Sequence, residues 1–302
     1  MRRAFLATVL TAGLALAATA SAEPAYKPFI LASTGPGDVA GTAAKVAEQL
    51  AAAGFEVVGS YSPYPTARIL VVTSADLKQA AAQTRFGAYG AGQRVSVTEI
   101  GGQVQVAYTN PPYMAAAYRM ASDLGDASAK LAQALGRQQE YGINEAMTKE
   151  DLGSYRYMFG MERFSDPHEL ASHASYAEAV ETVEKNLAAG IKGVGKVYRI
   201  DVPGREETVF GVSLNGRNGG GTQQDDAYIM SEIDFKEVRS TAHLPYEMVV
   251  SGNKVYALSA RFRIAINFPD LSMMGSHSFM NIMGSPDAIK EALTKAAGGG
   301  ES

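Results

Sequence analysis

The chain of 302 residues contains no cysteine and no tryptophan, and only 4 histidines. The absence of cysteine excludes a disulfide framework, thiolate-bound zinc or iron–sulfur clusters, a thiol nucleophile and cysteine-linked haem. Basic residues are not in excess, since 27 Lys and Arg stand against 31 Asp and Glu, and this disfavours a nucleic-acid partner. With 46% hydrophobic and 19% charged residues, the composition is typical of a soluble globular protein.

The first 22 residues have the pattern of a cleavable export signal. Arg2 and Arg3 form a positive start, residues 5–18 form a short apolar run, and Ala20-Ser21-Ala22 supplies the small residues that a signal peptidase requires. The apolar run is too short and too rich in alanine for a comfortable membrane span. We therefore predict cleavage before Glu23, a periplasmic or secreted location, and no stable membrane span after cleavage.

The same start also resembles the core of a twin-arginine signal, which exports folded and often cofactor-loaded proteins. The resemblance rests on Arg2-Arg3-Ala4-Phe5-Leu6, whereas Ala7 stands where a lysine is common. Ordinary export of the unfolded chain is the simpler interpretation, and both routes are open at this point.

After the signal, the chain repeats one pattern. In each copy an apolar pattern of helical spacing ends at a glycine, a strand-like segment follows, and a hairpin with a glycine-containing turn closes the unit. The paired segments are the helices 38–53 and 175–189, the strands 67–73 and 207–214, and the hairpins 94–109 and 245–262. A polar glycine-rich loop at 215–224 accounts for the extra length of the second copy.

We therefore predict an α+β protein of two related modules, each an antiparallel sheet with helices packed on one face, plus a helical connector. The expected organisation is a signal peptide (1–22), a first module (23–112), a connector with helices at 112–135 and 148–164 (113–174), a second module (175–270) and a C-terminal Met-rich segment with a helix (271–302).

The last hairpin opens with Leu-Pro-Tyr-Glu-Met-Val-Val at residues 244–250. Together with the order of helix, strands and hairpin, this segment resembles the bacterial domain-of-unknown-function family numbered 302, over 27–112 and 175–270. The resemblance implies small α+β domains that often form dimers, so two fused copies would form an intramolecular pseudo-dimer. Members often carry a cysteine where this chain has Tyr246, so the resemblance implies no cysteine-based role here.

Two glycines are candidates for cofactor binding. A strand-like segment at 29–34 leads into Gly35-Pro-Gly37-Asp-Val-Ala40 and then into a helix, which is the context of a dinucleotide phosphate site. The hairpins, however, favour antiparallel pairing, and exported proteins rarely meet free nicotinamide cofactors. A purely structural loop is therefore the favoured interpretation of Gly35 and Gly37.

The C-terminal segment offers the best candidate metal ligands. Thioether and imidazole groups bind Cu(I), and a cysteine-free protein would have to use them. The candidates are Met273, Met274, His277, Met280 and Met283, of which the last three could share one helical face. The alternative is that these methionines fill the core. We expect no cofactor, with copper as the alternative.

Aromatic residues gather at 155–164 and 61–65, where they could line a ligand cleft between the modules or simply pack. Asp225 and Asp226 are expected in a solvated turn. The sequence has no recognisable catalytic triad, nucleophile elbow or matched carboxylate pair, so no catalytic residue is nominated. We expect a non-catalytic exported binding or accessory protein for a small ligand or a periplasmic protein. The alternatives are a soft-metal (copper) binding protein and a cofactor-dependent enzyme or redox accessory exported folded.

Overall fold

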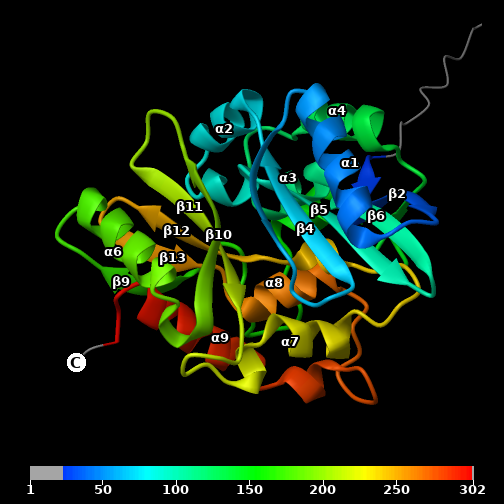
Figure 1. Ribbon diagram of the computed structural model, residues 1–302. Coiled ribbons are helices and arrows are strands. Elements are labelled where there is room, and N and C mark those ends of the chain that lie inside the picture. Colours follow the sequence, from blue (N-terminus) through cyan, green and yellow to red (C-terminus); the bar gives the residue numbers. More distant parts are fainter. Residues whose placement is uncertain (1–22, 301–302) are drawn as a thin grey trace, which may run out of the picture.

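The computed structural model describes residues 23–300 and shows an α+β protein with two antiparallel sheets (Figure 1). The predicted signal peptide, residues 1–22, lies outside the described residues. Within 23–300 no helix has both the length and the apolar character needed to cross a membrane. The predicted fold class of two related modules is confirmed.

The first sheet has the strand order β3-β4-β5-β6-β2-β7, with every neighbouring pair antiparallel. Its elements, in chain order, are β2 (Phe29–Gly35), α1 (Val39–Ala52), β3 (Glu56–Tyr61), β4 (Ala67–Thr73), α2 (Ala75–Ala82), the 3₁₀ helix η1 (Gly87–Gly90), β5 (Gln93–Ile100), β6 (Gln103–Thr109), α3 (Pro111–Ala117), α4 (Gly125–Leu135) and β7 (Gln139–Tyr141).

The second sheet has the order β10-β11-β12-β13-β9, again antiparallel throughout. Its elements are β9 (His168–Ser172), α6 (Tyr176–Ala188), η2 (Ile191–Gly193), β10 (Val194–Asp201), β11 (Glu207–Leu214), η3 (Thr222–Gln224), α7 (Asp226–Ile233), η4 (Thr241–His243), β12 (Tyr246–Ser251), β13 (Lys254–Ala257), α8 (Ala260–Asn267), η5 (Phe279–Ile282) and α9 (Ser285–Ala296). A small two-stranded ladder pairs β1 (Ala25–Tyr26), which precedes β2, with β8 (Met147–Thr148), which follows β7 in the sequence. Helix α5 (Lys149–Gly153) comes directly after β8.

The two sheets share one topology. When β9 to β13 are matched in chain order with β2 to β6, five strands of each sheet follow the same spatial order, and β7 adds a sixth to the first. The helices between the first two strands of each module also match. Asp38 caps α1 and Gly54 follows it with φ +84°, while Ser175 caps α6 and Gly190 follows it with φ +64°.

The prediction of a helical connector at 113–174 is partly wrong. Residues 113–174 contribute β7 to the first sheet and β9 to the second, so both modules extend into it. The expected helix at 148–164 is limited to α5, which ends at Gly153. It does not resume, since Gly160 takes a left-handed φ of +85° and Phe164 is buried in the core. The strand expected to continue to residue 262 ends at Ala257, and α8 begins at Ala260.

The modules pack through matching elements. Helices α1 and α4 cover the outer face of the first sheet, and α6 and α9 cover that of the second (Figure 1). On the inner side, η1 of the first module packs on β11 and β12, while η4 of the second packs on β4, β5 and β6. The edge strands β3 and β10 also meet, so closely that a Cβ on Gly59 would lie 2.3 Å from the Val197 carbonyl oxygen. One large core extends through both modules, and a smaller apolar cluster that includes Phe29, Tyr141 and Ala242 lies apart from it.

Candidate functional site

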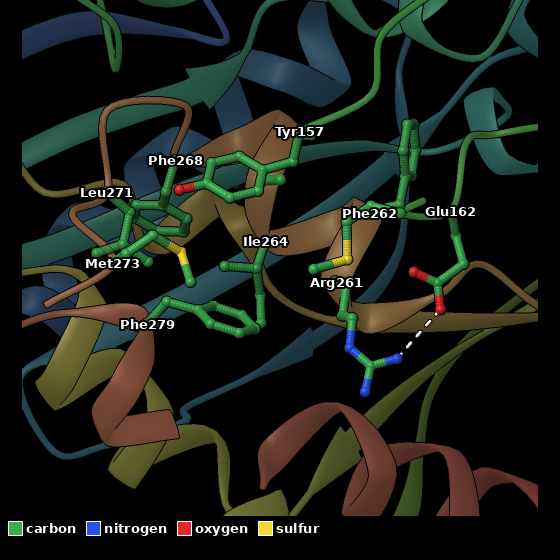
Figure 2. A pocket seen from close by; sticks show the side chains of 11 residues that line it. Tyr157, Glu162, Arg261, Phe262, Ile264, Phe268, Leu271, Met273 and Phe279 are labelled. Atoms are coloured by element: carbon green, nitrogen blue, oxygen red, sulfur yellow. Dashed lines mark hydrogen bonds and ion pairs between the residues drawn. The ribbon is translucent and has the colours of Figure 1, made fainter. Parts of the chain in front are cut away.

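An apolar pocket lies where the connector, α8 and the Met-rich segment meet (Figure 2). It has about 440 Å³ of free space, including that at its open mouth, and it is narrow. It is lined by Phe262 and Ile264 of α8 and by Phe268, which directly follows the helix, and all three side chains are buried. Figure 2 shows Tyr157 and Met273 beside Phe268 and Ile264, although they come from segments more than a hundred residues apart.

One charged pair borders the pocket. Arg261, on the first turn of α8, donates to Glu162 at 3.2 Å and to Asp287 of α9 at 3.1 Å. All three side chains keep contact with solvent, so both ion pairs are screened and weak. The site thus has an apolar interior with its charge at one end, which is the usual anatomy of a small-molecule site.

Exposed apolar side chains flank the pocket-lining residues in two loops, one in the connector and one in the Met-rich segment after α8. Met158 and Phe159 stand between the lining residues Tyr157 and Met161, and Phe159 is 94% exposed. In the C-terminal loop, Met274 directly follows the lining residue Met273 and is 72% exposed. Exposed apolar side chains around a pocket are more typical of a binding surface than of a packed core.

The predicted metal ligands divide between the pocket and solvent. Met273 lines the pocket, while Met274, Met280 and Met283 are exposed. His277 stacks on the ring of Phe235, with ring centroids 4.8 Å apart. The shared helical face expected for His277, Met280 and Met283 is wrong, because η5 begins at Phe279 and His277 has a left-handed φ of +67°. A metal at these residues stays a prediction.

The glycine loop forms the expected strand, turn and helix, but its surroundings differ from a phosphate site. Gly35 ends β2, and both neighbours of that strand are antiparallel to it. The amide of Gly41, in the first turn of α1, already donates to the Asp38 carboxylate at 2.7 Å. A phosphate at Gly35 and Gly37 would meet this negative charge. Cofactor binding here therefore stays a prediction with no added support.

A second candidate site lies buried between the modules. Arg94 of β5 donates to Glu247 of β12 at 2.6 Å, and Arg263 of α8 contacts the other oxygen of the same carboxylate. The three side chains are 1–3% exposed. Arg263 also donates to the carbonyl oxygens of His243 and Pro245, at 2.7 and 2.9 Å. We call Arg94, Glu247 and Arg263 the buried charge cluster.

Burial and the cluster shift the pKa values of neighbouring groups. Burial, together with the charges of Arg263 and Arg94, holds the pKa of His243 well below its usual range, so its ring is neutral. Burial raises the pKa of Tyr89 and Tyr198. Asp226 was expected in a solvated turn, but it is buried, and burial raises its pKa to about 8. It accepts from the Leu214 amide at 2.9 Å.

No family model matches the chain, and the searches of curated proteins and of solved structures give no significant match.

The buried charge cluster was missed by the sequence analysis. Arg94 belongs to a strand whose polar and apolar residues alternate, which is typical of a face open to water. One signal was available for Arg263, since a lone arginine stands in the apolar run 262–266. A charged residue within such a run is expected to have a buried partner. The pocket was partly anticipated, because Tyr157 and Met273 both lay in segments proposed to bind a ligand.

Proposed function

We propose that this chain is an exported, non-catalytic binding protein that takes an apolar small molecule into the pocket between α8, the connector and the Met-rich segment. The observation that carries the proposal is the convergence of three segments on one pocket. Phe262 and Ile264 come from α8, Tyr157 from the connector and Met273 from the C-terminal loop. Apolar side chains from both loops remain exposed beside it, as at Phe159.

The chemistry of the lining favours binding over catalysis. Its ionisable groups near the rim, Arg261 and Glu162, are paired with each other. The interior is made of aliphatic, aromatic and thioether groups, with the Tyr157 hydroxyl as a polar group that can orient a ligand. Such a lining selects a hydrocarbon or aromatic body with little charge, and it offers no activated nucleophile or base.

Shared topology supports the proposal that the two modules arose by duplication and form an intramolecular pseudo-dimer. The strand order is the same in both, and η1 and η4 each pack on the sheet of the other module. The resemblance to the domain-of-unknown-function family rests on the same features and is proposed with them. Export follows only from the signal pattern in residues 1–22.

The test compares two neighbouring methionines. Met273→Gln places an amide in the pocket, whereas Met274→Gln alters an exposed side chain. We expect Met273→Gln to weaken binding of the fluorescent probe 8-anilinonaphthalene-1-sulfonate by roughly threefold to tenfold, since part of the thioether contact in the pocket is lost. Met274→Gln should bind like the wild type. Equal binding by both variants would show that the probe does not occupy the pocket.

A soft-metal site is the second candidate. It is favoured by the exposure of three methionines, Met274, Met280 and Met283, in one segment with His277. Titration with Cu(I) separates the two functions, because replacing Met280 and Met283 by Leu should abolish copper binding and leave the dye unaffected. Protein that binds no Cu(I) would remove this candidate. Native mass spectrometry of protein purified from its source would reveal an organic or metal adduct directly.

A further inference from the structure

A second, polar pocket adjoins one end of the apolar pocket. It has about 340 Å³ of free space, including that at its mouth, and it shares the lining residues Phe268 and Leu271 with the apolar pocket. Figure 2 shows these two side chains at the end of the apolar pocket opposite Arg261 and Glu162. The second pocket, which we call the polar chamber, therefore lies beyond the end of the apolar pocket that carries no charge.

Two carboxylates contribute to the polar chamber, and backbone amides hold both in place. Asp234 directly follows α7 and is buried, and its carboxylate accepts from the amide of Ser240 at 2.8 Å. The carboxylate of Asp270 accepts from the amide of Asn144 at 2.8 Å. Asp234, Ser240 and Asp270 all line the chamber. Because a carboxylate has about four acceptor positions, both groups can also accept hydrogen bonds from a ligand.

The basic groups near the chamber leave these carboxylates available. Lys236 also lines the chamber, but its side chain is 54% exposed and its Nζ lies 3.7 Å from the Asp270 carboxylate, so the pair is weak. Arg239 donates to the backbone carbonyl of Asp234. Burial raises the pKa of Asp234 to about 6, which leaves the group largely ionised above neutral pH. A buried carboxylate attracts a cation and repels an anion more strongly than an exposed one does.

We propose that the apolar pocket and the polar chamber together bind an apolar amine, whose hydrocarbon or aromatic body lies along Phe262 and Ile264 and whose protonated amino group donates to Asp234 and Asp270. This inference rests on the proposed function, because it assigns a ligand class to the same pocket. A positive charge in a partly buried site requires an opposite charge beside it, and the two carboxylates supply one.

The polar chamber discriminates between head groups. An alcohol could donate one hydrogen bond to a carboxylate, but an ammonium group forms charge-assisted hydrogen bonds, which are about twice as strong as neutral ones. A carboxylate head would add a third negative charge next to Asp234 and Asp270. We therefore expect the amine to bind most tightly and the acid most weakly.

Three compounds with one body and different head groups test the proposal: 4-phenylbutylamine, 4-phenyl-1-butanol and 4-phenylbutyric acid, titrated calorimetrically at pH 7.5. We expect the amine to bind roughly tenfold to a hundredfold more tightly than the alcohol. Asp234→Asn and Asp270→Asn should each reduce this preference severalfold. Asp287→Asn is the matched control, because it removes an exposed carboxylate that pairs with Arg261 at the other end of the apolar pocket, and it should keep the preference.

Lys236→Met is a variant for which we expect tighter binding. It removes the ammonium group that lies 3.7 Å from Asp270 and competes with that of the ligand. The amine should bind roughly twofold to fivefold more tightly than to the wild type, and the alcohol should bind unchanged. A gain in affinity cannot result from misfolding, so the proposal stays testable even if Asp234→Asn does not fold.

The proposal would be overturned if the alcohol or the acid bound the wild type as tightly as the amine. It would also be overturned if the preference for the amine survived in both Asp234→Asn and Asp270→Asn, if it were lost in Asp287→Asn, or if Lys236→Met bound the amine no more tightly. The dye 8-anilinonaphthalene-1-sulfonate separates this result from the proposed function. If the dye binds and responds to Met273→Gln while the amine has no advantage, the pocket stands and the ligand class is wrong. If neither the dye nor any of the three compounds binds, the proposed function fails as well.

Discussion

Removing the charge of Glu247 without changing its shape gives the sharpest test of the junction between the modules. In Glu247→Gln the volume stays the same, so no cavity term enters. The two guanidinium groups, however, lose the carboxylate that both contact, and the new amide presents N–H donors to groups that are themselves donors. Two positive charges are then left buried and close together.

The expected loss of stability in Glu247→Gln follows from the burial of the three charged side chains. Removing one partner of a buried ion pair costs about 3–5 kcal/mol, and here one carboxylate serves two arginines that are at most 3% exposed. Against a total stability of about 5–15 kcal/mol, this is a large fraction. For a chain of this size we expect the melting temperature to fall by roughly 6–20 °C.

Arg94→Met is the matched comparison. It leaves Arg263 and Glu247 as a balanced pair, so it should cost clearly less than Glu247→Gln, even though it deletes a larger polar group. Asp76→Asn, which breaks the exposed pair between Asp76 and Lys130, should have little effect. Urea unfolding at pH 7, with midpoint and slope compared at low and high salt, measures all three.

The relative stabilities of these three variants test whether charge balance stabilises the junction. If Arg94→Met proved as damaging as Glu247→Gln, charge balance would not govern the junction, and packing of the side chains would be the better explanation. If Glu247→Gln cost no more than Asp76→Asn, the carboxylate would have to be hydrated in solution.

Two further predictions concern other parts of the junction. Because burial raises the pKa of Asp226 to about 8, the folded chain keeps a proton there that the unfolded chain releases near pH 4, so the free energy of unfolding should fall between pH 4 and pH 8, by at most about 1.4 kcal/mol per pH unit. Asp226→Asn should remove that part of the pH dependence, and an unchanged pH profile in urea unfolding would contradict it. Gly59→Ala should destabilise the protein by about 1–3 kcal/mol, because its Cβ would lie 2.3 Å from the Val197 carbonyl oxygen. Gly35→Ala, which meets no atom within 4 Å, is the control, and similar melting temperatures for both variants would show that the edge strands can separate freely.

Much of the fold could be predicted because its signals are local. Helix α1 extends over Val39–Ala52, close to the predicted range 38–53, and Gly54 follows its end as the pattern predicts. Strands β4 and β11 have the predicted bounds. Caps, turns and apolar spacing depend on neighbouring residues only, so a single sequence reveals them.

The junction could not be predicted because its partners are distant in sequence. Arg94, Ser96 and Thr98 alternate with apolar residues along β5, yet nearly the whole strand is buried on both faces. The polar face is covered by the segment around η4, where the Thr98 and Thr241 hydroxyls lie 3.0 Å apart. The Gln105 side chain likewise donates to the Glu237 carbonyl at 2.8 Å. The pattern predicts that this polar face is exposed to water, but its side chains form hydrogen bonds with residues of the second module instead.

Related topology does not give the modules related chemistry at their junction. Counting back from the hairpin turns, where Ile100 pairs with Gln103 and Ser251 with Lys254, places Ser96 in the first module where Glu247 stands in the second. Among the residues that the structure describes, Ser96 bonds only within its own sheet, to the Ala107 carbonyl, whereas Glu247 contacts arginines of both modules. A serine at both positions would leave two buried guanidinium groups without a carboxylate, so the junction requires that the copies differ. The asymmetry therefore requires two different modules, which one fused chain supplies and a symmetric pair of identical modules cannot.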